Sequence, residues 1–94
     1  MQDQRKAEDL KAYVSVDVCF DTNGQMRPKV LTWEDGSQYE IDRILDIRPG
    51  YAARAGGQGD RYTVRIENRV RQLFFEHNPE YGQRILGRWF VERK

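Results

Sequence analysis

The chain has 94 residues, 33% of them charged and 38% hydrophobic, with a formal net charge of +1. That length predicts one small domain with a modest core and little room for a deep catalytic cleft. The near-neutral charge excludes a global electrostatic bias toward nucleic acid, and no apolar run is long enough to predict a signal peptide or a membrane span.

Cysteine and histidine each occur once, as Cys19 and His77. A lone cysteine forms neither an intrachain disulfide nor a cysteine-based metal site, which is typical of a reducing compartment. We therefore expect a cytoplasmic protein without a membrane segment, a bound metal or a cofactor.

Residues 1–11 are polar and present no apolar face. They predict a flexible or short helical N-terminal arm before a single domain over residues 12–94. The strongest strand pattern follows in residues 12–21, where apolar side chains alternate with more polar ones. Its apolar positions are Val14, Val16, Val18 and Phe20. Turn residues at 21–25 then predict a reversal into a second strand over residues 29–33.

A tight turn at residues 34–37 predicts the start of a long strand over residues 38–48. The alternation of this strand is broken, because Arg43 and Ile44 each fall on the wrong face. An extra residue in a strand reverses the faces of all residues that follow it, so the pattern predicts a β-bulge near Asp42 and Arg43.

The second half of the chain is predicted as a loop followed by three strands. Residues 49–60 are rich in glycine and predict a loop with one helical turn at residues 51–55. Strands are predicted at residues 61–67, 70–76 and 88–93. A short turn at Asn68 and Arg69 joins the first two, and a polar connection at residues 77–87, with helical turns at residues 79–85, precedes the third.

Five or six short strands joined by turns predict an all-β fold, a small antiparallel barrel or sandwich with at most one or two short helical turns. The alternation also assigns a core of thirteen side chains: Val14, Val16, Val18, Leu31, Trp33, Ile41, Leu45, Ile47, Val64, Ile66, Phe74, Trp89 and Val91.

Several motifs between residues 33 and 92 carry a resemblance to a family. In chain order they are Trp33 to Gly36 (Trp-Glu-Asp-Gly), Ile41 to Arg43, Leu45 to Arg48, Ala55 to Gly57 with Gly59, Arg61 to Ile66, Leu73 with Phe74, and Arg88 to Glu92. With these motifs the chain resembles a family of short uncharacterised bacterial proteins. It departs from the family pattern at residues 77–87, where its connection is longer. The resemblance implies a compact SH3-like barrel and implies no activity.

Two local features have a chemical and a structural interpretation. Residues 56–59, Gly-Gly-Gln-Gly, offer successive backbone amides of the kind that cradle a phosphate. A strand rather than a helix is predicted after them, so a flexible or tight loop is the preferred interpretation. His77 stands at a predicted strand end, and nothing in the sequence places Cys19 or a serine beside it. A solvated turn residue is therefore preferred over a catalytic base or a metal ligand.

Four carboxylates cluster in the first half of the chain, at Asp35, Glu40, Asp42 and Asp46. A pair of carboxylates suits acid–base catalysis, but the arginines that are near in sequence favour cross-strand ion pairs instead. Because the sequence shows no paired nucleophile and base, no metal-ligand set and no cofactor loop, we predict that the protein is not an enzyme.

Arginine and aromatic side chains supply the candidate binding residues. The set is Arg54, Arg61, Arg65, Arg69, Arg71 and Tyr51, with Trp33 and Phe74 as further aromatic residues. Arg61 and Arg65 are predicted on one strand face, opposite Val64, with Arg71 close to Arg65. We expect acids of the long strand, such as Asp42 or Asp46, to pair with these arginines.

Two binding functions stay open. The preferred one is a non-catalytic small β-barrel binding module with a protein partner, because such barrels present loops and an edge strand. The alternative is a module that binds single-stranded nucleic acid through arginine and aromatic side chains. Salt-sensitive binding to a mixed oligonucleotide would separate the two.

Overall fold

The structure is a computed structural model that describes residues 10–52, 56–77 and 86–93. Seven strands are found there: β1 (Lys11–Phe20), β2 (Met26–Thr32), β3 (Gln38–Glu40), β4 (Arg43–Ala52), β5 (Gly56–Ile66), β6 (Arg69–His77) and β7 (Gly87–Glu92). The all-β prediction is confirmed, while the prediction of five or six strands is wrong. The helical turns expected at residues 79–85 and most of the arm at residues 1–11 lie outside the described residues.

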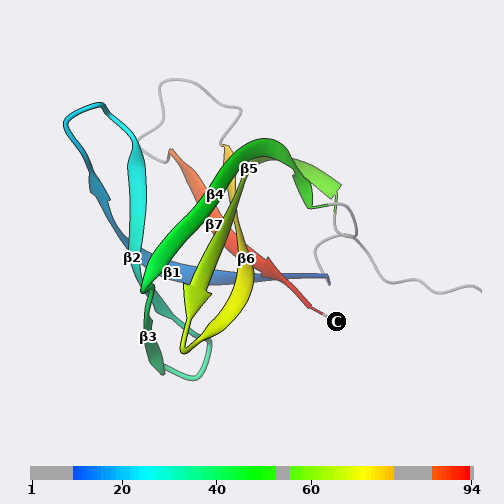
Figure 1. Cartoon of the computed structure of the whole chain (residues 1–94). Coiled ribbons are helices and arrows are strands. Elements are labelled where there is room, and N and C mark those ends of the chain that lie inside the picture. The colour runs from blue at the N-terminus through cyan, green and yellow to red at the C-terminus, as the bar shows by residue number, and fades with distance from the viewer. Residues whose placement is uncertain (1–9, 53–55, 78–85, 94) are drawn as a thin grey trace, which may run out of the picture.

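The strands form one antiparallel sheet in the order β3-β2-β1-β7-β6-β5-β4. The two strands at the ends of this order, β3 and β4, follow each other in the chain. Between them the backbone N–H of Ile41 donates to the carbonyl of Lys29 in β2 (2.8 Å), and that of Asp42 donates to the carbonyl of Arg65 in β5 (2.9 Å). The sheet therefore curls on itself as a half-barrel (Figure 1).

The predicted long strand is divided at this corner. β3 ends at Glu40 and β4 begins at Arg43, so the bulge predicted near Asp42 and Arg43 is instead a change of strand partner. The irregularity in register comes later, between Ile44 and Asp46. Leu45 is the extra residue there, and its 41% exposure shows that its assignment to the core is wrong.

The glycine-rich segment is strand at residues 49–52 and 56–60, so the predicted loop is wrong there, and residues 53–55 of the expected helical turn lie outside the described residues. β4 continues to Ala52, and β5 begins at Gly56. Gly59 pairs with Glu76 of β6, and a Cβ on Gly59 would overlap the carbonyl oxygen of Phe75. The glycine is therefore required by the close approach of two strands, and no phosphate-binding loop is formed there.

The inner face of the curled sheet carries the main core. Its buried members are Leu31, Ile41, Tyr62, Val64, Leu73, Phe75 and Trp89. Phe74 is also buried, but it packs on the outer face against Phe90, with the ring centroids 5.1 Å apart. Val18 is 37% exposed, contrary to prediction. The extra residue at the register shift beside it is Lys29 of β2, so β1 keeps its alternation, and Val18 and the exposed Phe20 lie toward the tip of the β1–β2 hairpin.

The remaining predicted core residues are half-buried around the main cluster: Val14, Val16, Trp33, Ile47, Ile66 and Val91. In the part of the chain that the structure describes, no helix has the length and hydrophobicity needed to cross a bilayer.

Candidate functional site

A pocket of about 810 Å³ lies where β6 and β7 separate. The two strands pair from Phe74 opposite Phe90 to His77 opposite Gly87. Before Phe74, β6 pairs with β5 alone, and after Phe90, β7 pairs with β1 alone, among the described residues. The start of β6 and the end of β7 therefore run apart (Figure 1), and the pocket lies between them.

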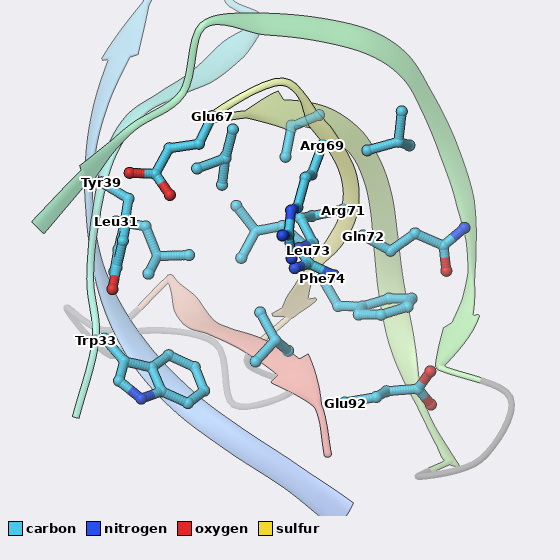
Figure 2. A pocket seen from close by; sticks show the side chains of 14 residues that line it. Leu31, Trp33, Tyr39, Glu67, Arg69, Arg71, Gln72, Leu73, Phe74 and Glu92 are labelled. Atoms are coloured by element: carbon cyan, nitrogen blue, oxygen red, sulfur yellow. The ribbon is translucent and has the colours of Figure 1, made fainter. Parts of the chain in front are cut away.

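One wall of the pocket is apolar and aromatic. Leu31 and Val64 line it and are buried. Tyr39, opposite Leu31 on β3, and Trp33 also line it and are half-buried (Figure 2). The Trp-Glu-Asp-Gly turn fixes Trp33 in place, since its backbone N–H donates to the carbonyl of Ser37 (2.7 Å) and its carbonyl accepts from the N–H of Gly36 (2.9 Å).

The conformation of this turn depends on its third and fourth residues. Gly36 has a φ of 90°, a left-handed conformation that glycine adopts without strain. The carboxylate of Asp35 accepts a hydrogen bond from the backbone N–H of Ser37 (2.9 Å), and this bond lowers the pKa of Asp35. Asp35 thus stabilises the turn through its side chain.

The other wall carries two arginines, Arg69 and Arg71. The β5–β6 turn contains two residues, Glu67 and Asn68, and both have positive φ (51° and 64°) as a type I′ hairpin requires. This turn length places Arg71 opposite Val64, on the inner face of the sheet. Within the described residues, neither guanidinium has an ion-pair partner.

The six predicted binding residues are thus not one surface. Arg69 and Arg71 line the pocket, while Arg61 and Arg65 lie on the outer face of β5. The expected closeness of Arg71 and Arg65 is wrong, because Arg65 is opposite Val70. Arg54 lies outside the described residues, and only the position of Tyr51 in β4 is described, not its side chain.

Arginines from β4 join the outer pair. Arg43 is directly opposite Arg65, and Arg48 is directly opposite Arg61, with the pair of Asp46 and Thr63 between them. We refer to Arg43, Arg48, Arg61 and Arg65 as the outer arginine ladder.

The predicted ion pairs of Arg61 and Arg65 with acids of the long strand are not formed. The Asp46 carboxylate pairs with Arg48 instead, at 2.8 Å from its Nε. The Nε of Arg61 is buried without a hydrogen-bond partner among the described residues, and Arg43 and Arg65 are exposed. The ladder therefore carries four cations and one acid on adjacent strands.

A third polar cluster, which the sequence did not reveal, surrounds Glu76 on the outer face. Its carboxylate accepts hydrogen bonds from Lys11 Nζ and from the hydroxyl of Tyr13 (2.9 Å), and the Arg88 guanidinium lies 3.8 Å from the centre of the Tyr13 ring. Burial alone would raise the pKa of Glu76, but the hydrogen bonds from Lys11 and Tyr13 outweigh it and lower the pKa. This cluster joins β1, β6 and β7 and is satisfied internally, so its role is structural.

His77 is exposed in β6 rather than in a turn, and its Nε2 lies 3.1 Å from a carboxylate oxygen of Asp60. Across residues 10–52, 56–77 and 86–93, no three His, Cys, Asp or Glu side chains gather at one point. The Asp46 carboxylate, as described, pairs with an arginine.

No family model matches the sequence, and neither does any curated protein or solved structure.

Proposed function

We propose that this protein is a non-catalytic, SH3-like binding module with a protein partner, and that the pocket between β6 and β7 is its binding site. The observation that carries the proposal is the position of Arg69 and Arg71, without ion-pair partners among the described residues, across from a half-buried Trp33. A cytoplasmic setting belongs to the proposal and agrees with Cys19, which is an exposed free thiol.

The composition of the pocket suits a segment of a protein that has both apolar and acidic side chains. Ligand pockets are lined mainly by apolar and aromatic groups, with a few polar groups that fix orientation, and typically enclose roughly 300–1,000 Å³. The 810 Å³ here exceeds the volume of one side chain, so several residues of the partner would enter it. Arginine binds carboxylates through two parallel hydrogen bonds and adds specificity to that contact.

A selection from a displayed peptide library tests this function. We expect enriched peptides with acidic and aliphatic residues, and we expect Arg71→Gln to weaken their binding. Arg65→Gln makes the same chemical change on the outer face and serves as the matched control. Enriched peptides that respond to Arg65→Gln but not to Arg71→Gln would contradict the assignment of the pocket. A library without enrichment would contradict the protein partner itself.

The outer arginine ladder favours a second candidate, binding of single-stranded nucleic acid. Like charges directly opposite each other on adjacent strands destabilise a sheet, and the ladder contains two such pairs. A polyanion would relieve that repulsion. Thr63 lies within the ladder and Gln72 beside it on β6, and arginine, threonine and glutamine are all residue types that contact phosphates.

Fluorescence anisotropy with a labelled mixed-sequence oligonucleotide tests the second candidate. The double variant Arg43→Gln/Arg65→Gln should weaken binding and reduce the slope of log K against log salt by roughly 0.7 for each phosphate that is no longer neutralised. The control is Arg69→Gln/Arg71→Gln, which removes the same charge from the pocket. Equal weakening by both pairs would indicate only a general charge effect, and an effect of the pocket pair alone would point to bases stacked near Trp33.

A further inference from the structure

We infer that the protein partner binds as an extended strand that pairs through its main chain with the free edge of β6 at Arg69–Leu73. This inference rests on the proposed function and specifies its mode. The partner segment would have side chains that alternate, with acidic and apolar residues on the face that enters the pocket.

The free edge follows from the pairing of β6. Arg69 to Glu76 all pair with β5, whereas β7 covers only Phe74 to His77 on the other side. No described strand thus lies beside Arg69–Leu73 on the side of β7. Such an edge has main-chain N–H and C=O groups that can template an added strand.

The hairpin turn shows which main-chain groups point to that edge. In a two-residue hairpin the closing residues, here Ile66 and Arg69, exchange hydrogen bonds with each other, and such pairs alternate along the ladder. Arg69, Arg71 and Leu73 therefore direct their main-chain groups toward β5. The N–H and C=O groups of Val70 and Gln72 point the other way, into the gap between β6 and β7.

The side chains around the gap specify what the added strand would carry. Successive side chains of a strand point to opposite faces of a sheet. Those on the inner face would meet Arg69, Arg71 and Leu73, and those on the outer face would meet Val70 and Gln72. Acids opposite the arginines and an aliphatic residue opposite Leu73 are the complementary choice. The edge is about 17 Å long at roughly 3.3 Å per residue, which fits a short peptide segment.

Val91 and Glu92 of β7 form the far side of the gap, and both line the pocket. An added strand would thus be enclosed on two sides rather than lie on an open edge (Figure 2). Val70, which is 58% exposed beside the gap, would lose apolar surface to the peptide. The peptide would gain both main-chain hydrogen bonds and burial of apolar surface.

Hydrogen exchange measured by NMR tests the main-chain pairing directly. In the free protein the amides of Val70 and Gln72 should exchange fast, while those of Arg69, Arg71 and Leu73 should be protected. The probe is a capped peptide with Thr at every second position. The positions between carry two Glu and then two Leu, and the peptide of reversed sequence is used beside it. The control peptide has the same composition, but its two Glu are next to each other in the sequence and so are its two Leu, which puts them on opposite faces of a strand.

We expect one of the alternating peptides to bind and to protect the amides of Val70 and Gln72. Arg71→Glu should weaken this binding roughly tenfold to a hundredfold, the range for a charge-assisted contact. A peptide with Lys in place of Glu should then recover affinity for that variant. Arg65→Glu, on the outer face, should have little effect.

Four results would overturn the inference. Binding that depends on Arg71 but leaves Val70 and Gln72 unprotected would exclude strand pairing and leave the proposed function standing. Failure of both alternating peptides to bind would exclude this partner chemistry, and the library selection would then decide the proposed function. Protection of both amides in a self-associated form would show that a second copy fills the gap, and protection by an oligonucleotide would show nucleic acid there.

Discussion

The two tryptophans should differ sharply when each is replaced by alanine. Trp89 is 7% exposed and packs between Tyr62 and Phe75, with ring centroids 5.1 and 5.0 Å away. Burial of about 200 Å² at about 25 cal/mol/Å² gives an upper estimate of roughly 5 kcal/mol, and large-to-small substitutions of this kind cost about 3–5 kcal/mol. Trp33 is less completely buried and lines the pocket, so its replacement should cost less than that of Trp89.

Equilibrium unfolding in urea, followed by far-ultraviolet circular dichroism, measures the difference. A loss of about 3–5 kcal/mol is a large part of a small domain's stability, so Trp89→Ala could fail to fold. In that case Trp89→Phe and Trp33→Phe are the variants to compare. The order should persist, with Trp89→Phe the more destabilising. Equal losses at the two positions would refute the assignment of Trp89 to the core and of Trp33 to the rim of a binding site.

Three further changes test other parts of the structure. Burial would raise the pKa of Glu76, but the hydrogen bonds from Lys11 and Tyr13 lower it below the unfolded value. The ionised Glu76 therefore stabilises the folded protein above about pH 4.3, and this stabilisation is lost as the pH falls through the folded pKa. Glu76→Gln leaves the buried Lys11 ammonium without its carboxylate partner, so it should lower the free energy of unfolding at pH 7 and flatten the acid limb of the stability curve, whereas an unchanged limb would contradict the network. Gly59→Ala should cost about 1–3 kcal/mol in urea unfolding, since its Cβ meets the backbone of β6, and a neutral effect would contradict the close approach. Arg43→Gln/Arg65→Gln should raise the melting temperature at low salt by relieving about 0.2–1 kcal/mol of repulsion, and a lowered value would indicate internal ion pairing.

Alternation of residue type located most of the strands but not the points at which their register shifts. Val16 and Val18 follow one pattern in the sequence, but nothing in that pattern shows that Lys29 of β2 is the extra residue opposite Asp17 and Val18. The glycines at residues 56–59 are likewise compatible with either a loop or a strand when only their neighbours in the sequence are considered. The need for a glycine at position 59 comes from the backbone of Phe75, which is distant in the sequence.

The candidate site was predictable in its residue types but not in its arrangement. A three-residue turn between β5 and β6 would put Arg71 opposite Arg65 on the outer face. The actual two-residue turn puts it opposite Val64 and divides the arginines between two faces. The contribution of Lys11 to the Glu76 cluster had no local signal either, because the two residues are 65 positions apart.

The β5–β6 turn fixes the sheet face on which Arg69 and Arg71 lie and the direction of the free main-chain groups of Val70 and Gln72. Glu67 has a φ of 51°, and a side chain with a Cβ in the left-handed region costs roughly 1–2 kcal/mol.

Glu67→Asn with Asn68→Gly gives the Asn-Gly pair that a type I′ turn favours, so urea unfolding should show a gain of about 1 kcal/mol with the register unchanged. Glu67 also lines the pocket, and strained residues tend to persist where they serve a site. Tighter binding of acidic peptides by the stabilised variant would show that the Glu67 carboxylate repels them. Unchanged affinity would show that its carboxylate takes no part in binding, and a loss of stability would refute the turn geometry itself.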